Sequence, residues 1–149
     1  MNTLQIRLAR VEDSKTLEDF LAYNNGEENR RLAQLYIQCM FSHDYRRPTF
    51  LIAESNNDII GCAAYSEEFF TVQTWGISWV SVHPSWRGRG IGGSLVEECL
   101  SGILSQAKRT VTVILATYPG KTRLYERHGF VSAGADHEGG SYMLKILEK

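Results

Sequence analysis

The residues best suited to chemistry lie in a glycine-rich stretch between positions 87 and 93. It reads Arg87, Gly88, Arg89, Gly90, Ile91, Gly92, Gly93. A strand pattern ends at Pro84 just before it, and a helical pattern begins at about Gly90 to Ile91. Backbone N–H groups at the start of a helix have no acceptor within the helix and therefore attract anions, and glycine lets a phosphate approach closely. The stretch therefore predicts a phosphate-binding turn. A purely structural role is less favoured, because each glycine inside a helix destabilises it by about 1 kcal/mol relative to alanine.

Two kinds of nucleotide-binding turn can be compared with this stretch. Gly88, Gly90 and Gly93 match the dinucleotide pattern G-x-G-x-x-G. That pattern also requires an acidic residue about 20 residues later, at the end of the next strand, and the strand predicted over Val111–Thr117 contains none. The P-loop pattern fails because no Gly-Lys-Ser/Thr follows. A dinucleotide-binding domain therefore remains the weaker hypothesis.

A second pattern follows the glycine turn after one more predicted strand. The turn itself reads Arg87-x-x-Gly90-x-Gly92 after Val80-x-Val82-His83-Pro84, and the later segment, residues 124–130, reads Leu-Tyr-Glu-Arg-His-Gly-Phe. The first pattern resembles the acyl-CoA-binding motif of the GNAT superfamily of N-acetyltransferases, and the second resembles that family's second signature. Residues 6–13 resemble the family's opening strand and first helix, residues 50–65 resemble its second and third strands, and residues 143–147 resemble its closing strand. The resemblance thus covers nearly the whole chain.

The resemblance implies an acyl-CoA-dependent N-acetyltransferase that uses acetyl-CoA as co-substrate and acetylates a primary amine of a small molecule or a protein. It implies that the pantetheine arm pairs with the backbone of Val80, Ser81 and Val82, and that an N–H near Val80 meets the thioester oxygen. Tyr125 occupies the position of the family's general acid. The turn would bind the cofactor through Arg87, Gly88, Arg89, Gly90, Ile91, Gly92 and Gly93. A homodimer is compatible with the resemblance.

The chain departs from the family pattern at positions that bear on mechanism. Tyr118 and Lys121 stand where the family often has asparagine and alanine, which leaves the side-chain contact to pantetheine open. Many members carry a carboxylate on the fourth strand, and Thr74–Val82 carries none. The groups that could accept the amine's proton or hold a cationic acceptor are Glu67, Glu68, Asp136 and Glu138. The missing carboxylate keeps a second hypothesis open, a non-catalytic module of the same fold that senses acyl-CoA.

The fourth strand shows a change of phase that the residues alone reveal. The large apolar residues Trp75, Ile77 and Trp79 stand on odd positions, whereas Val80 and Val82 stand on even ones. A strand with one buried face changes phase only where a residue is inserted, which is a β-bulge. We therefore predict a bulge near Val80, the alternative being a strand buried on both faces.

The remaining patterns predict the elements that position these residues. Alternation and apolar runs indicate strands at residues 4–8, 50–54, 59–65, 74–82 and 111–117, with two more around Gly139-Gly140. Helical spacing indicates helices near residues 14–23, 32–40, 91–107 and 122–128. In the second helix the predicted buried face is formed by Leu32, Leu35, Tyr36, Cys39 and Met40. We expect an α/β (mixed α+β) fold, a single GNAT-like domain over residues 1–149 whose central, mostly antiparallel mixed sheet has a bulged fourth strand and about four flanking helices.

Composition sets the outer limits of these hypotheses. The chain has 149 residues, 43% hydrophobic and 22% charged, with a net charge of −1, values typical of a globular domain and unfavourable for nucleic-acid binding. No apolar run approaches the ~18–20 residues of a membrane span and no signal peptide is evident, so we expect a cytoplasmic protein without a membrane partner. The scattered three cysteines and four histidines argue against a disulfide scaffold or a metal site. An acyl-cysteine route has no support, since neither Cys62 nor Cys99 lies in a motif.

Overall fold

Seven strands form one sheet in the computed structural model, which describes residues 4–69, 71 and 73–149. They are β1 (Leu4–Leu8), β2 (Thr49–Ser55), β3 (Asp58–Glu67), β4 (Thr74–Val82), β5 (Val111–Thr117), β6 (Val131–Ala135) and β7 (Ser141–Leu147). Their order is β1-β2-β3-β4-β5-β7-β6, and every neighbouring pair is antiparallel except β4 and β5. The predicted mixed, mostly antiparallel sheet is confirmed.

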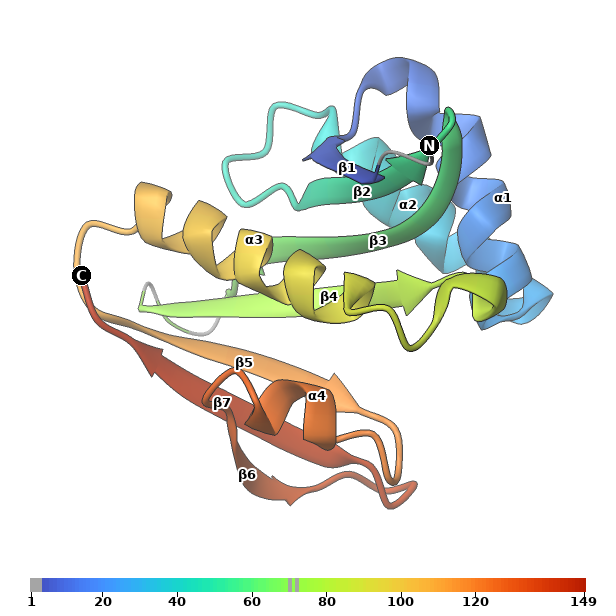
Figure 1. Ribbon diagram of the computed structural model, residues 1–149. Helices are drawn as coiled ribbons and strands as arrows, with labels where there is room; N and C mark the ends of the chain where they lie inside the picture. The colour runs from blue at the N-terminus through green and yellow to red at the C-terminus, as the bar shows by residue number, and fades with distance from the viewer. Residues whose placement is uncertain (1–3, 70, 72) are drawn as a thin grey trace.

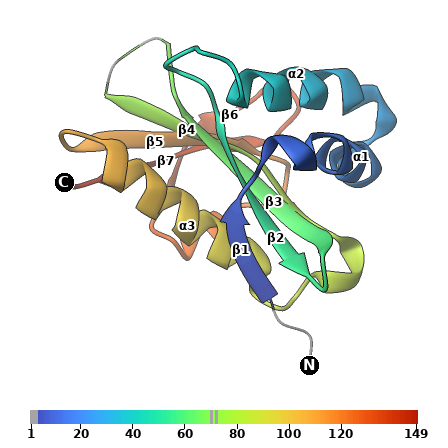
Figure 2. The same cartoon turned by 90° about the horizontal axis from the view of Figure 1, so that it is seen from above.

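Helices cover both faces of this sheet (Figure 1, Figure 2). α1 (Ser14–Asn25) and α2 (Arg30–Met40) pack on one face, and α3 (Ile91–Gln106) and α4 (Arg123–Glu126) pack on the other. Short 3₁₀ turns lie before α1, before α2 and after β4, namely η1 (Val11–Asp13), η2 (Glu27–Asn29) and η3 (Pro84–Trp86). The expected set of about four helices is confirmed. In the part of the chain that the structure describes, no helix has the length and apolarity needed to cross a membrane.

The buried face of α2 differs from the prediction. Ala33 and Ile37 are the buried residues of this helix, whereas Leu32 and Leu35 are exposed. Tyr36 and Met40 are partly buried against the cluster beneath α1 and α2. The buried stripe is centred on Ala33, whose small side chain permits close approach of the helix. The sequence pattern gave most weight to large apolar residues, and the predicted buried face of α2 therefore differs from the observed one by one residue position.

The predicted bulge in β4 is confirmed. Cys62 of β3 pairs with Ser81 and Ala64 pairs with Ser78, so Trp79 and Val80 stand opposite the single residue between them. Trp79 has a positive φ of 56°, a rare conformation for a bulky residue. The bulge restores the phase, since the side chains on both sides of it pack into the cluster beneath α3, namely Trp75, Ile77, Val80 and Val82. Trp79 itself lies on the α1/α2 side, so its assignment to the same face as Trp75 was wrong.

β4 and β5 are in register only at their N-terminal ends. The pairs are Thr74 with Thr112, Trp75 with Val113 and Gly76 with Ile114. Beyond these three pairs the two strands diverge towards their C-terminal ends, as Figure 1 shows. We call this feature the β4–β5 separation. The bulge at Trp79–Val80 lies on one side of it, and β4 leads through η3 into the glycine turn.

Candidate active site

The glycine turn adopts a conformation that requires glycine at two positions. Gly88 and Gly90 have φ values of 77° and 79°, and a Cβ built on either would meet no atom within 4 Å. Gly90 is the N-cap of the 16-residue helix α3, so the first N–H groups of that helix have no acceptor within the helix. Arg87 donates from Nε to the carbonyl of Val82 (3.2 Å), and the Arg89 guanidinium lies 4.6 Å from the Trp86 ring centre. The turn thus combines open N–H groups with two arginines at the end of β4.

Gly92 and Gly93 have a packing role that sequence reasoning missed. A Cβ on Gly92 would stand 3.3 Å from Cδ2 of Leu124, and one on Gly93 would stand 3.1 Å from Nε2 of His128. These two glycines therefore let α4 and the residues just after it approach the first turn of α3. No local signal in the sequence separates this role from anion binding, since it depends on where α4 docks.

Docking of α4 buries Tyr125 beside α3. The Tyr125 ring packs edge-on against Phe130 with ring centres 6.0 Å apart. Burial, and to a smaller extent the Cys99 thiol, raises the pKa of Tyr125 to about 12, so the hydroxyl keeps its proton at neutral pH. Among the described residues no hydrogen bond involves this hydroxyl. Tyr125 can therefore act as a proton donor on the α3/α4 face of the sheet.

The strand residues predicted to hold pantetheine have side chains that pack against the core or form a hydrogen bond. The side chains of Val80 and Val82 pack against the cluster beneath α3, and the buried Ser81 accepts a hydrogen bond at Oγ from Nδ2 of Asn25 (3.1 Å). Any ligand running along this part of β4 would meet main-chain groups. A bulge leaves its extra residue unpaired in the ladder, which suits the N–H of Val80 for a ligand.

The four carboxylate candidates lie at different places. Glu67 pairs with Trp75 and shares its α3 face, whereas the carboxylate of Glu68 lies over Gly76 on the opposite face. Burial raises the pKa of Glu68. Asp136 accepts from the backbone N–H of Gly140 (2.7 Å) and of Glu138 (2.9 Å) and so closes the β6–β7 turn. Glu138 is exposed in that turn, with Oε1 3.6 Å from Nε2 of His137.

The environments of Cys62 and Cys99 make their thiols poor nucleophiles. Cys62 and Cys99 are fully buried, and burial raises the pKa of both thiols, that of Cys99 to about 12. Both therefore remain protonated and weakly nucleophilic at neutral pH. Within residues 4–69, 71 and 73–149, no three His, Cys, Asp or Glu side chains are grouped to hold a metal.

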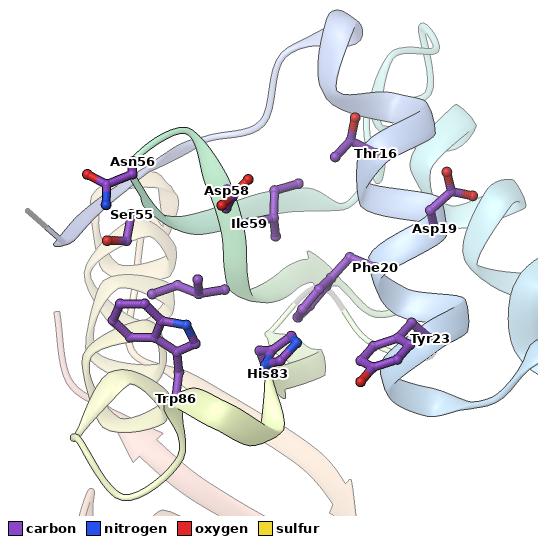
Figure 3. Close-up of a pocket in the computed structure, with 11 residues that line it drawn as sticks. Thr16, Asp19, Phe20, Tyr23, Ser55, Asn56, Asp58, Ile59, His83 and Trp86 are labelled. Atoms are coloured by element: carbon purple, nitrogen blue, oxygen red, sulfur yellow. The ribbon is translucent and has the colours of Figure 1, made fainter. Parts of the chain in front are cut away.

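A hollow of about 480 Å³ lies between α1, the β2–β3 turn and η3 (Figure 3). His83 accepts the backbone N–H of Ser85 at Nδ1 (3.1 Å) and stacks on Tyr23 with ring centres 5.6 Å apart. Phe20 and Trp86 form further parts of the wall, as Figure 3 shows. None of the residues predicted for the site lines this hollow. Trp86, which does line it, contacts Arg89 of the glycine turn.

Comparison with known proteins identifies a family with this fold. The family model of the acetyltransferase (GNAT) domain matches residues 46–132. Aminoglycoside 6'-acetyltransferase type Ii superposes with a TM-score of 0.79 at 18% identity, over 97% of this chain and 98% of that one. The GNAT family N-acetyltransferase YhbS from Escherichia coli, solved in complex with CoA, gives 0.77 at 19% identity, over 99% and 83%. A GNAT-family acetyltransferase from Desulfovibrio desulfuricans gives 0.78 at 20% identity, over 98% and 99%. No curated protein sequence matches the chain.

Proposed function

Because this chain belongs to the GNAT acetyltransferase family, we propose that it transfers an acetyl group from acetyl-CoA to a primary amine by direct attack. The observation that carries this proposal is the β4–β5 separation, with a bulge on one side and the glycine turn at its open end. A thioester arm needs main-chain partners along a strand, and a diphosphate needs N–H groups at a helix start. The strand backbone of β4 and the start of α3 follow one another along the chain, so one extended cofactor could use both.

The cofactor is proposed to follow this path from the turn inwards. Its diphosphate lies on the first N–H groups of α3 and on the turn between Arg87 and Gly93, where the two arginines add charge. Its pantetheine arm runs along Val80, Ser81 and Val82, whose side chains are engaged elsewhere. The acetyl group then points towards Gly76 and Ile114, where β4 and β5 meet.

The chemistry assigned to this arrangement is nucleophilic addition followed by loss of thiolate. The amine nitrogen bonds to the carbonyl carbon, and the N–H of Val80 stabilises the oxyanion that forms. The C–S bond then breaks, and Tyr125, as the general acid, gives its hydroxyl proton to the departing sulfur and regains one from the nitrogen that has bonded to the acetyl carbon. Buried, protonated thiols at Cys62 and Cys99 favour this direct route over an acyl-cysteine intermediate.

Thermal unfolding with separate additions of acetyl-CoA, CoA and NAD tests the cofactor assignment. Ligand at 100 times its Kd adds about 2.7 kcal/mol, a rise in Tm of about 5–10 °C for a domain of this size. A rise with acetyl-CoA and CoA but not with NAD supports the proposal, and the reverse result would restore the dinucleotide hypothesis. Amine-dependent release of CoA then distinguishes the enzyme from a non-catalytic acyl-CoA-binding module, which binds acetyl-CoA without turnover.

A further inference from the structure

The carboxylate of Glu68 occupies a space that exists because residue 76 has no side chain. The backbone N–H of Glu68 donates to the carbonyl of Thr74 (2.9 Å), which holds the start of the β3–β4 loop against β4. A Cβ built on Gly76 would collide with the Glu68 carboxylate. Since Trp75 and Ile77 pack beneath α3, Gly76 faces the α1/α2 side, and so does the carboxylate above it.

This carboxylate has no cationic partner among the described residues, where no Lys, Arg or His nitrogen lies within 4 Å of it. The titratable group that α2 presents to it is Tyr36, whose pKa is raised by burial and then by Glu68. Arg46, in the loop after α2, lies over the neighbouring Phe69 ring, 4.5 Å from its centre. A half-buried carboxylate without a counter-ion is unfavourable in the free protein. An ammonium group would offset that cost.

The sheet face next to Glu68 is apolar and uncovered. Gly76 is in register with Ile114, Ile114 with Leu144, and Leu144 with Val131, so these side chains share the α1/α2 face. Ile146 and Tyr142 stand on the same face of β7 and are exposed. The cluster beneath α1 and α2 takes its strand residues from β2, β3 and β4 alone in the described chain. An apolar surface thus begins beside the Glu68 carboxylate and extends over β5, β7 and β6.

We infer that Glu68, seated over Gly76, takes the proton of the acceptor ammonium, and that the acceptor is an amine whose apolar body lies on this face of β5 and β7. The inference rests on the proposed acetyl transfer. The site lies where β4 and β5 meet, which is where an acetyl group entering from the open end points. Ser78 is the β4 residue on the same face between Gly76 and the bulge.

The proton balance is as follows. The acceptor enters as R–NH₃⁺, and one N–H bond breaks as its proton passes to the Glu68 carboxylate, directly or through one water. The neutral nitrogen then bonds to the acetyl carbon, and the C–S bond breaks. The second proton lost by nitrogen ends on the CoA thiol, while Glu68 returns its proton to solvent. The sum is R–NH₃⁺ plus acetyl-CoA giving R–NH–CO–CH₃, CoA and H⁺.

Four variants, three single and one double, are compared with the wild type to test the role of Glu68, with hexylamine as acceptor and CoA release as the signal. Glu68→Gln is expected to lower kcat/KM about 100-fold and to abolish the acid limb of its pH profile, because the proton acceptor is lost. Gly76→Ala displaces only the end of a flexible side chain, so the protein folds, and kcat/KM falls to a similar extent. Glu98→Gln, an equal charge change on the exposed side of α3, keeps wild-type activity.

The double variant separates positioning from structure. If Gly76 acts only by seating Glu68, the alanine substitution has no further effect in the Glu68→Gln protein, and the two losses are not additive. Full activity of Glu68→Gln would overturn the proton-acceptor role, and additive losses would overturn the positioning role of Gly76. Failure of the wild-type protein to bind acetyl-CoA or release CoA would instead refute the proposed acetyl transfer.

The apolar body is tested with amines of equal basicity. KM for hexylamine is expected to be at least about 10-fold lower than for ethylamine, because its four additional methylenes bury apolar area. Ile146→Glu changes an exposed residue and is expected to remove this preference while acetyl-CoA still raises Tm. Equal KM values for both amines would overturn the apolar-body assignment. So would a stable dimer that Ile146→Glu dissociates, since a second copy would then cover the face.

Discussion

At the scale of single residues, burial changes the pKa of Tyr125 and of Glu68 in the same direction, although we propose opposite roles for them in proton transfer. Burial raises the pKa of both. For the phenol this means that the proton is held throughout the physiological range, as a hydrogen-bond donor to a leaving thiolate requires. For the carboxyl it means a stronger affinity for a proton than an ordinary glutamate has, which suits a group that must remove one from an ammonium ion. Burial thus favours both the proposed proton donor and the proposed proton acceptor.

Removing the Tyr125 hydroxyl is expected to slow turnover without loosening the fold. Tyr125→Phe keeps the edge-on contact with Phe130 and removes the donor to sulfur, so kcat should fall about 100-fold. Steady-state kinetics measures the change, and the Tm rise with acetyl-CoA should match that of the wild type. Unchanged kcat would remove the acid role from this residue.

The free energy of unfolding should respond to Glu68 in a pH-dependent way. Its folded pKa lies above the unfolded value of about 4.3, so the ionised form is disfavoured in the folded state and costs stability above that folded pKa. Glu68→Gln should therefore raise Tm at pH 7–8, and the difference should vanish below about pH 4, where the carboxyl is protonated in both states. Thermal unfolding across pH checks this, and a lower Tm of the variant at pH 8 would contradict it.

At the scale of elements, the loop from β4 to α3 depends on backbone conformation more than on side chains. Gly88 and Gly90 adopt left-handed φ values, and Gly92 and Gly93 admit α4 against α3. Four glycines in six residues thus divide into two pairs with different tasks. The first pair shapes the open turn, and the second sets the distance between two helices.

Replacing Gly90 should weaken the cofactor site through strain. Gly90→Ala places an L-residue at a φ of 79°, which costs about 1–2 kcal/mol or forces the turn to rearrange. We expect Kd for acetyl-CoA to rise about 10-fold and Tm to fall by a few degrees, measured by calorimetry and thermal unfolding. Ser94→Ala, in the helical part of α3, is the matched control and should leave both values near wild type.

The elements also show what could be predicted from the sequence. The bulge followed from the phase of Val80 and Val82 against Trp75 and Ile77, because a two-residue period is strict. The α2 face was misplaced because a small residue, Ala33, lies at its centre. The position of the Glu68 carboxylate could not be predicted from the sequence. It depends on the register of β3 with β4 and on the space left because Gly76 has no side chain. Local patterns specify elements, whereas volumes arise from their packing.

At the scale of the whole molecule, the sheet consists of two parts joined by a short seam. Only three register pairs connect β4 to β5 in the described chain, and the cluster beneath α3 continues across them from β2 to β7. The cluster beneath α1 and α2 stops at β4. α3 therefore holds the two parts together on one face and leaves the other face open beside the seam. Tyr125 and Glu68 lie on opposite faces of that seam.

The β4–β5 separation has a consequence for kinetic order. If the thioester occupies the separation from the turn at its open end and the amine approaches over the uncovered face, neither substrate blocks the other, so both are bound together before any bond changes. Initial-rate plots at several fixed amine concentrations should then give intersecting lines, and CoA should inhibit competitively against acetyl-CoA. Parallel lines would indicate that the acetyl group leaves as part of a covalent enzyme form before the amine arrives. The protonated thiols of Cys62 and Cys99 give that form no ready attachment point.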